Sequence, residues 1–305
     1  MAYARRRFSS YKAKRRTKPS GRRSRYTART PRRTSRRSYP AKRMTRKRIL
    51  NLTSTKKKDT MMSFSNLASS GDTSGPETAQ DATLLGGVGQ FYTICWSPTM
   101  RPAETITNVK GTKVEESVRT SNTIFARGVQ ETIKLSTRTS TGWQWRRVCF
   151  TSKDDSIFQD DVSMDTSPVA RITSNGMVRL ANQYPTETLL EKIFRGVRGN
   201  DWQDVMTAQI DTRIITLKYD KVRSIRSGND SGVSNVYKMW HPMNKNLVYQ
   251  DEEQGGQQFT SPISTRSKAG MGDYYIVDFF VPFGSSTSGD DLSFWPQATF
   301  YWHEK

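Results

Sequence analysis

The residues best suited to chemistry in this sequence are the Lys and Arg side chains of its N-terminal segment. Residues 1–58 contain 24 of the 49 Lys and Arg and no Asp or Glu. The segment therefore carries +24, whereas residues 59–305 carry 25 − 28 = −3, and the two parts sum to the net charge of +21. Such a segment cannot fold alone, because like charges repel and there is little apolar surface to bury. Its expected partner is a polyanion, whose phosphates would be neutralised with release of counterions.

The basic residues of this segment form eight clusters, and Tyr or Phe side chains lie between them. Aromatic rings of this kind can stack on unpaired bases, so the pattern favours a nucleic acid as the polyanion. A single cluster could be a solvated charge run, but eight clusters without one acid argue against that interpretation. The predicted DNA-binding residues are Arg5, Arg6, Arg7, Lys14, Arg15, Arg16, Arg22, Arg23, Arg32, Arg33, Arg36, Arg37, Lys42, Arg43, Arg46, Lys47, Arg48, Lys56, Lys57 and Lys58.

Residues 42–48 form a basic heptamer of the kind read as a nuclear localisation signal. We therefore expect a nuclear import receptor of a host cell to be a partner. The predicted signal consists of Lys42, Arg43, Arg46, Lys47 and Arg48.

A second basic and aromatic group lies within the near-neutral part of the chain, at Trp143, Trp145, Arg146 and Arg147. One interpretation is a DNA-binding surface, on which bases stack against Trp while Arg contacts phosphate. The other is a core strand with buried Trp and with Arg on its solvent side, a common pattern in half-buried strands. The second interpretation is favoured.

Five aspartates between residues 154 and 165 could in principle hold a divalent cation. Their spacing does not match a calcium loop, and a solvated or intersubunit loop is the favoured interpretation. The cluster consists of Asp154, Asp155, Asp160, Asp161 and Asp165.

The sequence predicts no catalysis, no cofactor and no metal site. Cys95, Cys149, His241 and His303 are the only Cys and His residues, and their spacing fits no zinc site. The two cysteines are expected to be buried, unpaired thiols. There is no GxxxxGK[ST] or GxSxG motif, and the glycines of residues 86–89 lack the strand–turn–helix setting of a phosphate loop.

The elements that would hold these residues are mostly strands. Period-two alternation predicts eight of them, and one helix is predicted at residues 185–196. Eight strands with long connections and one short helix predict an all-β jelly-roll sandwich. We expect the last strand to be integral to the core. The predicted strands span residues 60–67, 90–96, 129–138, 143–151, 211–220, 234–249 with a break near Pro242, 274–283 and 297–303.

Two parts follow from this: a disordered basic arm at residues 1–58 and a jelly-roll body at residues 59–305. We predict that deleting residues 2–58 leaves a folded body. No apolar run approaches the roughly 20 residues that span a bilayer, so no membrane insertion is expected. The N-terminus lacks the apolar stretch of a secretory signal, and its Pro and Arg pairs fit a mitochondrial transit helix poorly.

Four stretches carry a resemblance to a known family: residues 1–7 (MAYARRR), 142–147 (GWQWRR), 195–202 (RGVRGNDW) and 211–220 (DTRIITLKYD). Together with the basic arm and the jelly-roll pattern, the chain resembles capsid proteins of genomoviruses, the gemycircularvirus-like group of circular single-stranded DNA viruses. The resemblance implies one jelly roll, sixty copies in a T=1 icosahedral shell, and arms that point inward onto the genome. It also implies a location in the virion, and in the host nucleus during assembly.

Two other functional classes also contain proteins with basic segments. A cellular nucleic-acid-binding protein, associated with chromatin or the ribosome, usually continues its basic charge onto the folded surface. Here the basic excess stops near residue 58. A replication-initiator endonuclease of the same viruses would need a metal-binding histidine pair and a phosphate loop, and neither is present.

Overall fold

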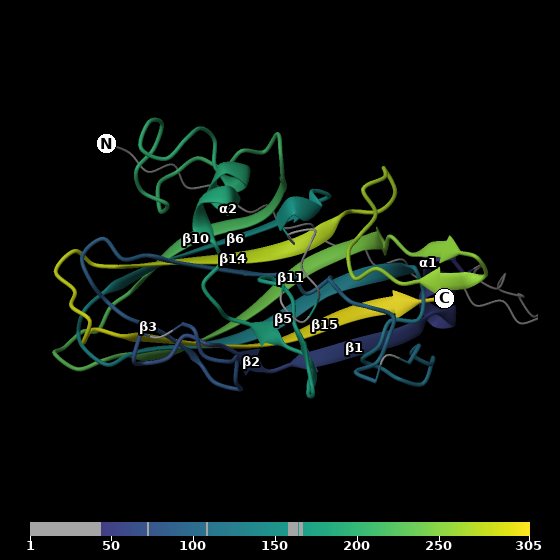
Figure 1. Cartoon of the computed structure of the whole chain (residues 1–305), viewed down its shortest axis with the longest axis horizontal. Coiled ribbons are helices and arrows are strands. Elements are labelled where there is room, and N and C mark those ends of the chain that lie inside the picture. Colours follow the sequence, from purple (N-terminus) through teal and green to yellow (C-terminus); the bar gives the residue numbers. More distant parts are fainter. Residues whose placement is uncertain (1–43, 72, 108, 158–163, 165–166) are drawn as a thin grey trace, which may run out of the picture. The chain divides into compact units, whose positions relative to one another are not determined.

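The computed structural model describes residues 44–305 except 72, 108, 158–163, 165 and 166. The chain divides into two units, Met1–Met44 and Thr45–Lys305. The predicted arm before residue 44, with its clusters from Arg5 to Arg43, lies outside the described residues. The second unit is mostly β and contains two antiparallel sheets packed as a sandwich (Figure 1).

Eight long strands form these two sheets. The first sheet has the order β1 (Thr55–Met61), β15 (Leu292–Glu304), β5 (Thr123–Thr137) and β11 (Ser234–Val248), and the short β3 (Ala82–Leu84) pairs with one end of β15. The second has the order β10 (Thr216–Ile225), β6 (Trp143–Ser152), β14 (Asp273–Pro282) and β4 (Tyr92–Trp96). If the eight long strands are counted from first to last along the chain, the order across one sheet is first, eighth, third and sixth, and the order across the other is fifth, fourth, seventh and second. The predicted eight-stranded jelly roll is confirmed.

Short elements fill the connections. A 3-10 turn, η1, spans Asp155–Ile157, and a helix, α2, spans Thr186–Ile193. The remaining short strands pair as β2 (Ser63–Phe64) with β9 (Arg179–Leu180), β7 (Ile172–Thr173) with β8 (Gly176–Met177), and β12 (Glu252–Gln254) with β13 (Gln257–Phe259).

Several elements differ from the sequence prediction. The first, third and last strands were predicted at residues 60–67, 129–138 and 297–303, but each begins five or six residues earlier, at Thr55, Thr123 and Leu292, and the first strand ends at Met61. β10 begins at Thr216 instead of residue 211, because residues 212–214 form a turn in which the Asp211 carboxylate accepts from the backbone N–H of Arg213 at 2.9 Å. β11 continues through Pro242, although this residue has no backbone N–H to donate. The strand accommodates it because the pairing with β5 shifts register between Pro242 and Lys245. A helix that was not predicted, α1 (Arg46–Thr53), precedes the first strand.

The helix predicted at residues 185–196 is confirmed as α2. Its apolar stripe, Leu189, Leu190 and Ile193, is buried in one cluster with Val148 of β6 and Phe279 of β14. Figure 1 shows α2 beside β10, β6 and β14. The two central strands of the second sheet, β6 and β14, are therefore covered on both faces and buried along almost their whole length, whereas the edge strand β10 is largely exposed.

In the first sheet, buried and exposed residues alternate along the strands, because one face of the sheet is solvated. In β15, buried residues such as Phe300 and Trp302 alternate with more exposed ones such as Tyr301. The inward side chains pack in two apolar clusters between the sheets. Neither helix of the described residues, each eight residues long, could cross a bilayer.

Candidate nucleic-acid interface

Helix α1 carries the part of the predicted DNA-binding and nuclear localisation residues that the structure describes. Arg46, Lys47 and Arg48 are all exposed on it. The helix starts there because Thr45 is its N-cap, and the Thr45 hydroxyl accepts from the backbone N–H of Arg48 at 3.4 Å. The helix has no buried residue, so these three cations are open to a partner.

The three lysines at residues 56–58 belong to strand β1 and do not share one role. Lys56 and Lys58 are exposed. Lys57 is buried, and its Nζ donates to the backbone carbonyls of Val118 at 2.7 Å and Thr112 at 3.3 Å. The prediction that Lys57 binds DNA is wrong, because strand alternation turns it into the body. The body also starts before Asp59, since β1 begins at Thr55.

The group at residues 143–147 does not form a DNA-binding surface. Trp143 and Trp145 are completely buried, and Arg146 and Arg147 are 5% and 1% exposed. The DNA-binding interpretation is contradicted, because base stacking needs an accessible ring. The core-strand interpretation is correct for the tryptophans, but it placed the arginines in solvent. They are buried because α2 and the inter-sheet space cover both faces of β6.

Arg146 lies on the face of β6 that is turned toward α2. Its guanidinium makes a bidentate pair with Asp220, at 2.9 and 2.8 Å, and donates to the carbonyls of Val205 and Ala208. The guanidinium also lies 5.2 Å from the centre of the Phe194 ring. These contacts leave no part of Arg146 for phosphate.

Arg147 lies at the centre of a buried ionic cluster between the sheets. It binds Asp278 through two bonds of 2.7 Å and also pairs with Glu131. Arg179 bridges the same two carboxylates, each at 3.1 Å. Two cations thus face two anions from β5, β6, β9 and β14, with side chains at most 1% exposed. The cluster joins the two sheets, and burial of all four charges together avoids an unpaired one.

His241 and Cys149 border this cluster. The His241 Nε2 atom is 3.9 Å from Glu131 and its Nδ1 atom 3.8 Å from the Cys149 sulfur. Burial, with the adjacent Arg147 cation, lowers the pKa of His241 to about 4. Burial raises the pKa of both cysteine thiols. Cys95 and Cys149 are free and buried, as predicted.

The structure describes only part of the aspartate cluster. The Asp154 carboxylate pairs with Lys192 of α2, whereas Asp160, Asp161 and Asp165 lie outside the described residues. Among the residues that the structure does describe, no group of three His, Cys, Asp or Glu side chains converges as metal ligands would.

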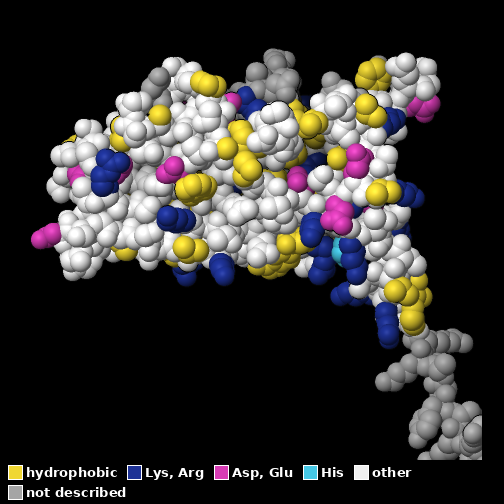
Figure 2. All heavy atoms as spheres, turned by 90° about the horizontal axis from the view of Figure 1, so that it is seen from below, with side chains coloured by type: hydrophobic (Ala, Val, Ile, Leu, Met, Phe, Trp, Pro, Cys, Tyr) yellow, Lys and Arg dark blue, Asp and Glu magenta, His cyan; other side chains and the backbone are white. Residues whose placement is uncertain are grey.

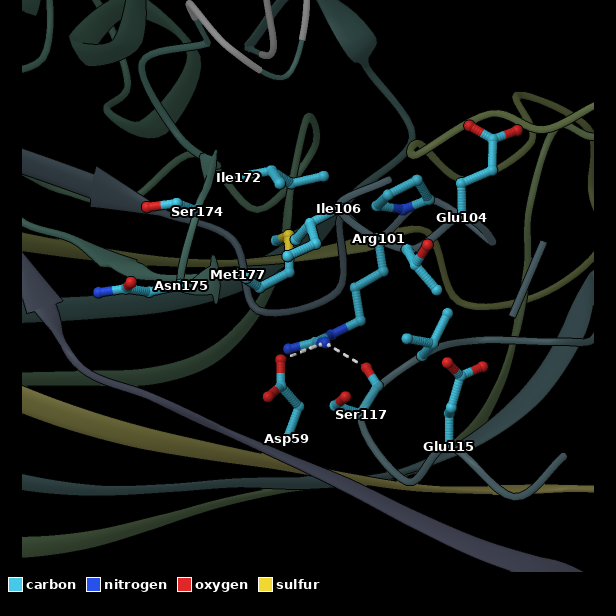
Figure 3. Close-up of a pocket in the computed structure, with 14 residues that line it drawn as sticks. Asp59, Arg101, Glu104, Ile106, Glu115, Ser117, Ile172, Ser174, Asn175 and Met177 are labelled. Atoms are coloured by element: carbon cyan, nitrogen blue, oxygen red, sulfur yellow. Dashed lines mark hydrogen bonds and ion pairs between the residues drawn. The ribbon is translucent and has the colours of Figure 1, made fainter. Parts of the chain in front are cut away.

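A pocket of about 370 Å³ lies between the first sheet and the β7–β8 hairpin (Figure 3). Arg101 points into it, but its guanidinium donates to Asp59 at 2.6 Å and to the Ser117 carbonyl at 3.4 Å. The other charged groups that line the pocket are Glu104 and Glu115. Carboxylates repel phosphate, so this pocket does not suit a nucleic acid.

The outer face of the first sheet has the opposite character. Its outward positions carry five basic side chains and neither Asp nor Glu. In the view of Figure 2, Lys and Arg with apolar side chains between them occupy the lower part of the surface. Sequence reasoning missed this face because its members come from four separate segments. The five basic residues are Lys56 and Lys58 of β1, Arg127 and Lys134 of β5, and Lys238 of β11.

Aromatic rings lie among these cations. Trp240 is 48% exposed and Trp295 is 49% exposed, and Tyr301 lies 5.8 Å from Trp240 between ring centres. His303, next to Phe125, has a pKa lowered by partial burial and then by the nearby Arg127 and Lys56 cations. We call these rings and the five basic residues the basic face.

Comparisons of the chain with protein-family models and with curated proteins find no match.

Proposed function

We propose that the chain is a viral capsid protein that packages circular single-stranded DNA, of the genomovirus kind that its sequence resembles. The observation that carries the proposal is the division of charge: an acid-free segment of +24 leads directly into the first strand of a near-neutral jelly roll. One part is suited to neutralising a genome, and the other to packing against copies of itself.

The amount of charge fits a small genome. With the buried Lys57 left out, each arm carries +23, and sixty arms would carry about 1,380 positive charges, enough to neutralise about as many phosphates one to one. A body at −3 lets neighbouring subunits pack without the repulsion that +21 spread over the surface would cause.

The fold supports the proposal that the chain is a capsid protein. A jelly roll is an architecture of viral capsid domains, although it also occurs in other proteins. The chain enters it through α1 and β1, whose exposed cations Arg46, Lys47, Arg48, Lys56 and Lys58 extend the basic segment up to the body.

Nuclear import would precede assembly in the host nucleus. The exposed position of Arg46, Lys47 and Arg48 on α1 suits recognition by an import receptor. Replacing these three together with Lys42 and Arg43 by Ala should shift a fluorescent fusion of the chain from nucleus to cytoplasm.

Electron microscopy of the full-length protein, purified from cells that express it, tests the main proposal. The expected result is uniform small shells that protect single-stranded DNA from nuclease. Binding should weaken steeply with salt and show little base preference. A monomer at every salt concentration, or strong preference for one sequence, would instead indicate a cellular nucleic-acid-binding protein.

A further inference from the structure

We propose that the basic face of the β1–β15–β5–β11 sheet is a second DNA-binding surface, on which unpaired bases of the genome stack. The inference rests on the proposed packaging function and adds a contact made by the folded body to the one made by the arm.

Charge is the first observation. The body as a whole is slightly acidic, yet no outward position of the four strands holds a carboxylate. Carboxylates lie at the borders of this face: Asp81, at the β3 end, accepts a hydrogen bond from Ser293, and the backbone carbonyl of Glu116 accepts from the N–H of Lys58 beside β1. Residues 59–305 have a net charge of −3, so a sheet face that carries five cations and no carboxylate is the part of the folded unit suited to a polyanion.

The rings are the second observation. Trp240 and Trp295 each expose about half of their surface in a protein whose other described Trp side chains are mostly buried. Trp295 of β15 pairs with Lys134 of β5, so the two side chains lie next to each other on the face. Trp240 of β11 pairs in the same way with Gln130 of β5. Large exposed rings next to Lys, without acids, are the composition of a single-strand binding platform.

The register arranges cations and rings in rows across the sheet. One row runs Lys58, Tyr301, Gly128 and Pro242, and the next runs Lys56, His303, Phe125 and Asn246. Adjacent strands are about 4.8 Å apart, so each row spans roughly 15 Å. In each row a lysine of β1 therefore lies beside a ring of β15, so a DNA strand that passes from β1 onto β15 meets a cation and then a ring.

Trp240 is held in place before any ligand arrives. A Cβ atom on Gly128 would lie 2.8 Å from the Trp240 ring and 2.5 Å from the His241 carbonyl oxygen. The ring therefore lies against the backbone of β5 at the one residue that leaves room for it. A ring fixed in this way loses little conformational entropy when a base stacks on it.

Single-stranded DNA fits this surface better than the other polyanions. A duplex hides its bases, and a sulfated polysaccharide has none, so both would use the five cations but not the exposed rings. The opposite sheet offers no such surface on its central strands, because α2 covers β6 and β14.

The experiment compares two double variants of the full-length chain. Lys134→Gln with Lys238→Gln removes two of the five cations of the basic face, and Lys221→Gln with Lys268→Gln removes two exposed lysines outside it. Binding of a thymidine oligonucleotide is measured in dilute solution across a range of salt concentrations. For the face variant, the slope of log K against log salt should become shallower by about 1.4, because each lost phosphate contact contributes about 0.7.

Base stacking is tested separately. Trp240→Leu should weaken binding of the thymidine oligonucleotide by about fivefold or more. It should leave binding of a blunt duplex and of heparin unchanged. Ultraviolet crosslinking of the oligonucleotide to the wild-type chain should label peptides that contain Trp240, Trp295 or Tyr301. Unchanged thermal melting of each variant shows that the fold is intact.

The outcomes separate the two proposals. If the wild-type chain does not bind the oligonucleotide, the packaging function itself fails. If it binds, but both double variants have the same slope and no face peptide is crosslinked, the basic face is not a DNA-binding surface and packaging by the arm stands. If Trp240→Leu weakens the binding of heparin as much as the binding of the oligonucleotide, the face binds polyanions without base stacking, and the inference is overturned.

Discussion

Nζ of Lys57 lies 3.6 Å from Oε2 of Glu304, so a buried ion pair joins the first strand of the body to the last. Glu304 also accepts from the Trp302 indole at 2.8 Å and from the backbone N–H of Thr120 at 3.2 Å. Replacing Glu304 by Ala leaves Lys57 as an unpaired cation inside the protein. We expect the free energy of unfolding to fall by about 3–5 kcal/mol, measured by urea denaturation.

An exposed ion pair provides the control for Glu304→Ala. Arg138 lies 2.9 Å from Asp291, but its side chain is 72% exposed. Arg138→Ala should therefore cost less than about 1 kcal/mol. Equal losses in the two variants would contradict a special role for burial.

The position of Lys57 changes the expected effect of removing the basic segment. Deleting residues 2–44 should abolish most DNA binding and leave a folded body. Deleting residues 2–58 removes four of the seven residues of β1, from Thr55 to Lys58, together with the partner of Glu304. Contrary to the expectation from sequence, this longer deletion should lower the melting temperature markedly. Identical melting curves for the two deletions would show that β1 is dispensable.

The buried cluster around Arg147 should respond strongly to the loss of one charge. Asp278→Asn leaves Arg147 and Arg179 with Glu131 as the one remaining carboxylate of the cluster. We expect a loss of about 3–5 kcal/mol by chemical denaturation. Glu187→Gln, which removes the exposed partner of Arg198, is a suitable control and should cost less than about 1 kcal/mol.

His241 should make stability depend on pH in a defined window. Its pKa of about 4 in the folded protein is below the ordinary value of 6.5, so the unfolded chain binds the proton more readily. The free energy of unfolding should therefore be greatest above pH 6.5, and it should decrease by roughly 3 kcal/mol as the pH drops toward 4. Asp278, whose pKa is lowered by Arg147 despite burial, titrates below this window.

His241→Gln is the matched variant for this window. It should remove most of the pH dependence between 4 and 6.5, measured as urea denaturation at several pH values. Glu131, Arg147, Arg179, Asp278 and Cys149 surround position 241 in both proteins, so the difference between the two curves reports on the His241 imidazole. A variant with the wild-type slope would show that other groups cause the loss of stability in acid.

The sequence by itself determined the features that depend on local pattern and on total charge. Alternation at residues 274–283 and 297–303 predicted strands, and the stripe of Leu189, Leu190 and Ile193 predicted a helix. The acid-free run up to Lys58 predicted a polyanion-binding segment. The strands and the helix are confirmed, because periodicity belongs to neighbouring residues, and the polyanion-binding segment stays a prediction.

Tertiary structure alone decided which of those residues are accessible. Trp143, Trp145, Arg146 and Arg147 look like a binding patch, but α2 and the other sheet cover them. Trp240 and Trp295 look like ordinary strand residues, yet they lie together on the open face of the first sheet. The physical reason is that burial depends on what packs against each face of a strand, and those partners come from distant parts of the chain.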